Sequence, residues 1–265
     1  MGGLSSSSRR ALRCSLALGG ALMLAAPSAN AQVNAEALRS TLRTNPRFLW
    51  LEGALVGRAG NTQTLTFAGS AFGAITHDRH VFFGRLSADY GQARAQTTVA
   101  RWMAHARYNY RLTDVVALEA LSQVQHDRFR RLAVRDLYGA GLRFNLANEE
   151  EFEFFAGTTY LFEHEIIETV PGSPSTNDVW HRSSNYVGAN LRVAPLVDAS
   201  TVTYVQPRFD RPLDFRLLSE SFVSFAITKL LSARVSASLW YDNRPPFDVR
   251  TYDLEVKNSL VVKLQ

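Results

Sequence analysis

Apolar and polar side chains alternate from Arg101 to Glu165, and this alternation limits the chain more than any other feature. Successive side chains of a β-strand point to opposite faces, so a period of two gives each strand one apolar and one polar face. In the first segment the apolar set is Trp102, Ala104, Ala106, Tyr108 and Tyr110. The polar set is Arg101, Met103, His105, Arg107, Asn109 and Arg111. The pattern predicts long strands that line a sheet with one strongly polar side.

Aromatic residues stand at both ends of these apolar faces, with small residues between them. They are Trp102, Tyr108, Tyr110, Phe152, Phe154, Tyr160 and Phe162. A strand from Phe152 to Phe162 spans roughly 33 Å, or roughly 25 Å of height at a tilt of ~40°. That height matches the apolar band of an outer-membrane barrel, where aromatic girdles mark the two water interfaces. We therefore expect an all-β, transmembrane, antiparallel up-and-down barrel with these seven residues in its girdles, located in the outer membrane.

The beginning of the chain resembles a secretory leader. Residues 1–31 combine basic Arg9, Arg10 and Arg13 with an apolar stretch and a small-x-small site at Ala29-Asn30-Ala31. The leader holds three of the 29 Lys and Arg and none of the 24 Asp and Glu, so the remaining chain is nearly balanced in charge. That balance gives no argument for a nucleic-acid partner. The only cysteine, Cys14, lies in the leader, which predicts a mature chain without disulfides.

After the leader we expect a short periplasmic segment over 32–47 and a single barrel over 48–265. No apolar run there reaches the roughly 18 residues that a membrane helix needs. The expected strands are 48–58, 62–76, 80–90, 97–111, 115–126, 134–146, 150–165, 182–193, 200–206, 215–228, 232–242 and 251–264. This even number is typical of a bacterial barrel, and the connections after odd strands, such as Gly91–Gln96 and Ile166–His181, are mostly longer than those after even strands.

The polar faces of these strands supply the predicted lining of the lumen. It consists of Arg85, Arg101, His105, Arg107, Arg111, Glu119, Arg143, Glu151, Glu153, Arg192, Arg216, Glu220, Arg234, Glu255 and Lys257. If strands pair about Leu112–Asp114 and Ala147–Glu149, His105 faces Glu119 and Arg143 faces Glu153. Two interpretations stay open: an ion-pair network that fills the lumen, or a polar constriction that selects small solutes. Eight strands leave an interior that side chains just fill and sixteen leave a channel, so twelve lie between the two.

One catalytic alternative deserves comparison with this non-enzymatic interpretation. His181 and Ser183 lie two residues apart, hence on one face of a strand, and resemble the His-x-Ser pair of outer-membrane phospholipases. Such chemistry also needs a third group that orients the base, and neither Asn190 nor Asn177 is convincingly placed for it. The six histidines form no metal-ligand motif. We therefore predict no catalytic residues, no metal and no cofactor, with a lipid hydrolase as the alternative.

Several stretches resemble the salt-induced outer-membrane protein family, a family of unknown function. They are Val33–Arg39, the turn Gly60-Asn61-Thr62, Tyr108–Thr113, His126–Arg131, Arg135–Arg143, Asp214–Arg216, Ile227-Thr228, Tyr241-Asp242 and Pro245-Pro246. The resemblance implies an outer-membrane location and a link to salt or osmotic stress, and it supplies no catalytic residues. The implied partners are outer-membrane lipid, lipopolysaccharide and the barrel insertion machinery, and we expect a monomer. The chain ends Val262-Lys263-Leu264-Gln265, without the terminal aromatic residue that the insertion machinery usually recognises.

Overall fold

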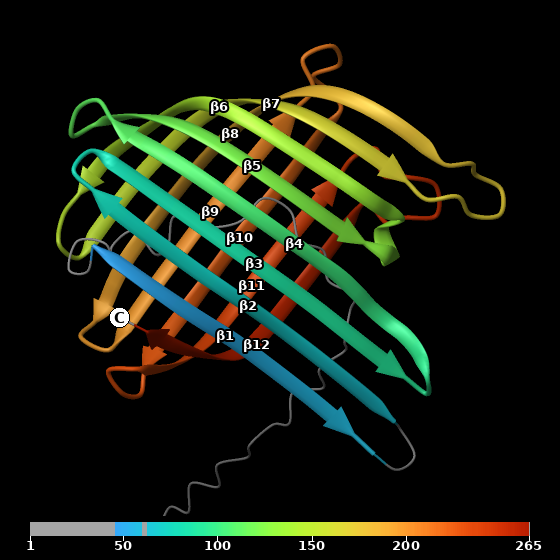
Figure 1. The fold of residues 1–265 in the computed structure, drawn as a ribbon, viewed down its shortest axis with the longest axis horizontal. Coiled ribbons are helices and arrows are strands. Elements are labelled where there is room, and N and C mark those ends of the chain that lie inside the picture. The colour runs from blue at the N-terminus through green and yellow to red at the C-terminus, as the bar shows by residue number, and fades with distance from the viewer. Residues whose placement is uncertain (1–45, 60–62, 265) are drawn as a thin grey trace, which may run out of the picture.

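The computed structural model describes residues 46–59 and 63–264. In these residues twelve strands form one closed antiparallel barrel, in which each strand pairs with its neighbours along the chain and β1 pairs with β12 (Figure 1). The strands are β1 (Arg47–Arg58), β2 (Thr64–His77), β3 (His80–Ala93), β4 (Gln96–Arg111), β5 (Val116–Asp127), β6 (Leu132–Asn148), β7 (Phe152–Ile167), β8 (Thr176–Ala194), β9 (Val197–Pro207), β10 (Phe215–Ala226), β11 (Leu231–Asp242) and β12 (Tyr252–Leu264). One 3₁₀ turn, η2 (Arg128–Arg130), follows β5. The predicted fold class is confirmed.

Most predicted strand bounds lie within a few residues of the observed ones, and two differences are informative. β8 begins at Thr176 rather than at residue 182, because the residues from Thr176 onward already pair with the end of β7. The first of these pairs joins Thr176 to Ile167. The predicted connection Gly91–Gln96 is wrong, because β3 and β4 continue to a tight turn at Arg94 and Ala95. Both turn residues have positive φ, as a two-residue hairpin requires. The expected leader, nearly all of the 32–47 segment and the Gly60-Asn61-Thr62 turn lie outside the described residues.

The two ends of the barrel carry different connections. At one end, called here the turn end, the connections are 78–79, 112–115, 149–151, 195–196 and 227–230. At the other, called the loop end, they are 59–63, 94–95, 128–131, 168–175, 208–214 and 243–251. In Figure 1 the turn end lies on the left and the loop end on the right. No helix in the described residues is long and apolar enough to cross a membrane.

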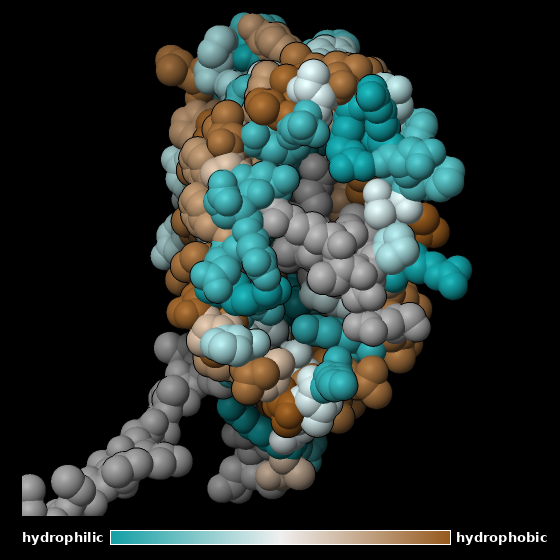
Figure 2. Space-filling view, turned by 90° about the vertical axis from the view of Figure 1, so that its left-hand side faces the viewer, coloured by the Kyte–Doolittle hydropathy of each residue, from teal (hydrophilic) through white to brown (hydrophobic). Residues whose placement is uncertain are grey.

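The barrel is apolar outside and polar inside, the reverse of a soluble protein. Leu86 on the outer face is 62% exposed, whereas the guanidinium-bearing Arg107 inside is only 2% exposed. In β4 and β5 every second side chain is buried in the lumen, so the alternation seen in the sequence becomes the two faces of the wall. Figure 2, which views the turn end, shows hydrophilic side chains gathered around that end and hydrophobic ones on the flanks.

All seven predicted girdle residues lie on the outer face of their strands. Tyr108 packs against Phe82 on the neighbouring strand near the turn end, with ring centroids 4.8 Å apart. Near the loop end, Tyr138 and Phe162 pair at 6.4 Å. The small residue Ala104 occupies the middle of the outer face of β4. Tyr110 and Phe152 lie at the turn end of their strands, whereas Trp102 and Tyr160 lie near the middle. The sorting of aromatic residues by height therefore stays a prediction.

Candidate functional site: the interior of the barrel

Glu119 of β5 is the centre of a buried polar cluster in the middle of the lumen. Its carboxylate accepts hydrogen bonds from Tyr186 Oη at 2.9 Å and from Thr159 Oγ1 at 3.2 Å. Asn109 Nδ2 donates to it at 3.3 Å, and Arg107 Nη1 lies 3.6 Å away. These groups come from β4, β5, β7 and β8, so the cluster links strands across the interior. Each side chain is 4% exposed or less, so the cluster is packed protein rather than a hydrated channel wall.

The aromatic part of this cluster is seated on a glycine. Gly157 of β7 faces inward, and a methyl group at that position would overlap the Tyr186 ring. Phe155 lies beside the same ring, with centroids 6.4 Å apart. Together with Val202, Tyr204, Leu218 and Trp240 these two rings form a buried apolar cluster inside the barrel. Glycine on this wall therefore supplies the space that lets large side chains fill the lumen.

A second polar cluster closes the lumen near the loop end. The Glu163 carboxylate of β7 forms ion pairs with three arginines. Arg135 Nε lies at 2.9 Å and Arg182 Nε at 2.8 Å, and Arg216 Nη1 also donates to it. Arg216 also binds Glu165 and Asp242. Glu163 is 0% exposed, so its charge is balanced entirely by protein groups. Three guanidinium groups from three strands meeting on one carboxylate form a rigid layer across this part of the barrel.

Outside this layer, a cavity of about 230 Å³ opens at the loop end between 168–175, 208–214 and 243–251. Arg131 clamps its wall, donating to Glu168 O at 3.1 Å and to Phe247 O at 2.8 Å. Arg208 stacks on the Trp180 ring at 3.6 Å and donates to Asp210 Oδ1 at 2.9 Å. Because Arg208 hydrogen-bonds it, the pKa of the Asp210 carboxyl lies below its usual range.

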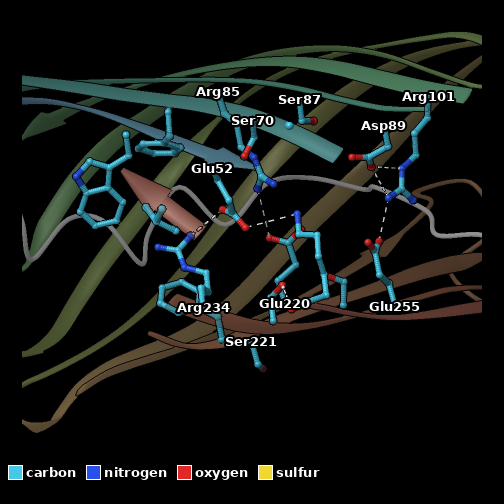
Figure 3. Close-up of a pocket in the computed structure, with 18 residues that line it drawn as sticks. Glu52, Ser70, Arg85, Ser87, Asp89, Arg101, Glu220, Ser221, Arg234 and Glu255 are labelled. Atoms are coloured by element: carbon cyan, nitrogen blue, oxygen red, sulfur yellow. Dashed lines mark hydrogen bonds and ion pairs between the residues drawn. The ribbon is translucent and has the colours of Figure 1, made fainter. Parts of the chain in front are cut away.

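The remaining side of the lumen, between β1–β4 and β10–β12, holds a third set of charges. Glu52 of β1 accepts from Arg234 Nη1 at 3.0 Å and from Ser259 Oγ at 2.6 Å. Arg101 of β4 binds Asp89 and reaches across to Glu255 of β12 at 2.9 Å. Between these groups lies a cavity of about 70 Å³, toward which Glu52, Arg85, Glu220 and Arg234 point from opposite walls (Figure 3).

This cavity is closed toward the turn end by apolar side chains that the sequence reading missed. Phe48, Trp50, Phe72, Ala74, Val81, Phe83 and Val261 are buried together inside the barrel. Their strands begin or end there, and the inward positions of β1 and β2 in this group, such as Phe48, Trp50, Phe72 and Ala74, carry apolar residues instead of charges. The predicted lining consists of charged side chains and His105, so it omits the apolar residues on the same face.

The structure buries most of the predicted lining residues inside the barrel and moves a few away. Arg101, His105, Arg107, Glu119, Arg143, Glu153, Arg216 and Arg234 are 9% exposed or less, and Arg85, Glu220, Glu255 and Lys257 line the 70 Å³ cavity. Three others lie at the rim of the turn end, where they are exposed instead of buried in the lumen. Glu151 lies exposed in a turn, Arg192 is exposed beside Asp198, and Arg111 is exposed and donates to Asp78 O.

Both predicted cross-strand pairs are also wrong in register. His105 stands opposite Gln123, at 3.1 Å between Nδ1 and Oε1, because the turn between β4 and β5 extends to Val115. Arg143 stands opposite Gly157, because the turn between β6 and β7 lies at 149–151 instead of 147–149. Each of these two shifts amounts to four residues, an even number, so the side chains keep their face and change their partners.

His181 and Ser183 lie on the outer face of β8, away from the lumen. His181 Nδ1 is 2.5 Å from Tyr160 Oη, and Ser183 Oγ accepts from Asn185 Nδ2 at 2.9 Å. In the described part of the chain no hydrogen bond joins this histidine to this serine, so the geometry gives no activated nucleophile. Over the same residues no three His, Cys, Asp or Glu side chains form a group that could hold a metal ion.

An apolar outer surface around a charged, tightly packed interior defines a β-barrel of the membrane-spanning type. A family model described as "Protein of unknown function, DUF481" matches residues 52–264, and the chain belongs to this family. The salt-induced name that the resemblance suggested stays a prediction. A comparison with curated proteins finds no match.

Solved structures of similar shape are outer-membrane barrels of low sequence identity. A NanC porin is 10% identical over 82% of this chain and 99% of its own, with a TM-score of 0.48. A KdgM porin in complex with disordered oligogalacturonate is 7% identical over 83% and 98%, with a TM-score of 0.42. The translocator domain of the autotransporter NalP from Neisseria meningitidis is 8% identical over 83% and 87%, with a TM-score of 0.43. With TM-scores below 0.5, these likenesses carry no inference about what this chain binds or transports.

Proposed function

We propose that this chain is a non-enzymatic barrel that spans an outer membrane, with the turn end in the periplasm. Lipid offers no hydrogen bonds, so a closed barrel with an apolar belt is the arrangement of strands that such a medium permits. The outer face provides that belt, and the three longest connections, 168–175, 208–214 and 243–251, all lie at the loop end. The expected lipid and lipopolysaccharide contacts and the monomeric state belong to the same proposal.

Within this location, the packed lumen supports a structural role better than general diffusion of solutes. The carrying observation is the cluster around Glu119, where Arg107, Thr159 and Tyr186 are all 4% exposed or less in the middle of the barrel. The layer around Glu163 closes the interior a second time, nearer the loop end. We propose that the barrel is rigid and does not conduct hydrated ions at rest.

Conductance in planar bilayers tests this proposal directly. The purified protein should insert and give no steady open-channel current, whereas a double substitution that empties the centre, Arg107→Ala with Tyr186→Ala, should create one. The control variant Tyr160→Ala, which changes an outward-facing side chain, should give no open-channel current. A wild-type current of porin size would contradict the packed lumen, and failure to fractionate with outer membranes would contradict the location.

A second candidate function, passage of very small polar solutes, is favoured by the 70 Å³ cavity beside Glu52 and Arg101. Substituting Phe72→Ala would shorten the apolar barrier that separates this cavity from the turn end. Uptake of a small neutral solute such as glycerol into proteoliposomes should then rise over wild type if the cavity is part of a path.

For the predicted stress link, cells lacking the protein should grow less well in high salt, and equal growth would remove that part of the proposal.

A further inference from the structure

The contact between β1 and β12, called here the seam, is much shorter than the strands that form it. Ladder pairs run only from Leu49↔Leu264 to Gly53↔Leu260. Both strands continue toward the loop end, but in the described residues no ladder pair joins Ala54–Arg58 to Tyr252–Ser259. By contrast, β1 pairs with β2 along its whole length. Along the loop-end half of the seam, the described parts of β1 and β12 therefore lack the ladder of backbone hydrogen bonds that joins neighbouring strands elsewhere in the barrel wall.

Inside the barrel, charged side chains take over where the ladder ends. Glu52 of β1 reaches Ser259 and Lys257 of β12, at 2.6 and 3.5 Å. The next inward residue of β12 toward the loop end, Glu255, instead binds Arg101 of β4 at 2.9 Å. The loop-end part of β12 is thus bound across the lumen to β4 rather than to β1. This contact draws β12 away from β1 and keeps the seam open.

The 70 Å³ cavity lies directly behind this seam, between the strands on its two sides (Figure 3). Three of the residues that line it each carry a buried polar atom without a hydrogen-bond partner: Ser87 Oγ, Arg101 Nη1 and Arg234 Nε. Buried polar groups are almost always paired, so these groups could bind an occupant with acceptor oxygens once their side chains turn toward the cavity.

The charges around the cavity describe that occupant further. The bases are Arg85, Arg101, Arg234 and Lys257, and the acids are Glu52, Asp89, Glu220 and Glu255. Four of each leave the cavity without net charge, and Ser70, Ser236 and Ser238 add hydroxyl groups to its lining. Such a site suits an uncharged, hydroxyl-bearing group better than a phosphate or a carboxylate.

The outer surface of the seam is amphipathic. Leu55 and Val256 present 71% and 61% of their surface on either side of it. Opposite Leu55 in the continued register stands Asn258, an exposed amide on a face that is otherwise apolar along β12. Unpaired backbone groups next to lipid need partners, and hydroxyl groups can both donate to and accept from them.

We propose that the seam is a lateral opening that admits an amphiphile with an uncharged, hydroxyl-bearing head group, as in a glycoside or an acylglycerol. The head occupies the 70 Å³ cavity, and the alkyl chain stays outside against Leu55 and Val256. This inference rests on the proposed membrane location and adds a ligand class and an entry route. It does not require the lumen to conduct.

Paired cysteines in a Cys14→Ser background test the opening in lipid nanodiscs. Leu51→Cys with Val262→Cys lies within the ladder, and Leu55→Cys with Asn258→Cys lies four residues along each strand in the same register, so both pairs would be equivalent in a closed wall. The ladder pair should oxidise readily, and the seam pair should not, because its strands stand too far apart for a disulfide. Equal oxidation of both pairs would overturn the proposal. A disulfide between two copies carrying Leu55→Cys alone would also overturn it, in favour of a second copy on the seam.

Fluorescence quenching tests the ligand, since Trp50 lines the cavity. An alkyl glucoside brominated near its head, added below its micelle concentration, should quench wild-type fluorescence saturably. The saturable part should disappear in Trp50→Phe and in Ser87→Leu, which fills the cavity, and persist in Ser122→Leu on the outer face; Ser87→Ala covers the case in which the larger variant does not fold. A brominated alkyl phosphate that quenches equally well, or a glucoside without saturable quenching, would overturn the proposal. Failure of the ladder pair to oxidise, or of the protein to enter nanodiscs, would instead count against the barrel location itself.

Discussion

Tyr186 on β8 donates a hydrogen bond of 2.9 Å to Glu119 on β5, across the interior of the barrel. Removing the hydroxyl by Tyr186→Phe leaves a buried carboxylate with one donor fewer. We expect the free energy of unfolding to fall by about 1–3 kcal/mol, the usual cost of leaving a buried polar group unsatisfied. Denaturant titration in lipid vesicles measures this, with Tyr160→Phe on the outer face as the control. Equal losses for the two variants would mean that the internal bond contributes nothing special.

Glu163→Ala should be the most destabilising single change in the loop-end layer. It leaves Arg135, Arg182 and Arg216 facing one another without their shared carboxylate. Breaking a buried ion pair from one side typically costs about 3–5 kcal/mol. The matched control is Asp210→Ala, which removes an exposed acid and leaves Arg208 paired with Asp214, so stability should stay nearly unchanged. If both variants unfold at the wild-type denaturant concentration, the layer around Glu163 has no structural role.

Gly157→Ala tests whether the lumen is truly full. The added methyl group would overlap the Tyr186 ring, so the ring must move in a crowded interior. Overpacking of this kind typically costs about 1–3 kcal/mol. Gly53→Ala is the natural comparison, because nothing lies within 4 Å of a methyl group there. Thermal unfolding should separate the two variants, and a lumen with room to spare would leave them alike.

Ala104→Lys tests the apolar belt. The side chain lies on the outer face midway along β4, where a charge near the bilayer midplane costs about 2–4 kcal/mol. Ala104→Leu adds similar bulk without charge and should be nearly neutral. Unfolding in vesicles against unfolding in detergent provides the measurement, since the loss should depend on the lipid. A loss of equal size for leucine would point to sterics rather than to the membrane.

The wall of this barrel could be predicted from the sequence, and its interior only in part. The alternation of apolar and polar residues along β4 and β7 is visible in each strand by itself, without knowledge of the strand it pairs with. The two faces of each strand and the number of strands could therefore be predicted from this period of two residues. Register depends on single turn and bulge residues, and therefore His105 received the wrong partner. Contacts such as Tyr186 with Glu119 join strands that are not neighbours, and no local pattern encodes them. The prediction omits the inward apolar group around Trp50, because it assigns only charged positions and His105 to the lumen.

The seam also determines how the barrel must assemble. Every other ladder joins strands that follow each other in the chain, but closure brings Leu49 to Leu264, nearly the whole sequence apart. Bringing such distant segments together has the highest chain-entropy cost of any pairing in the molecule, and contacts of this kind form slowly. With few ladder bonds to offset that cost, the open sheet should be a long-lived folding intermediate. Substitutions in β12 should accordingly slow the final folding phase while leaving the early ones unchanged.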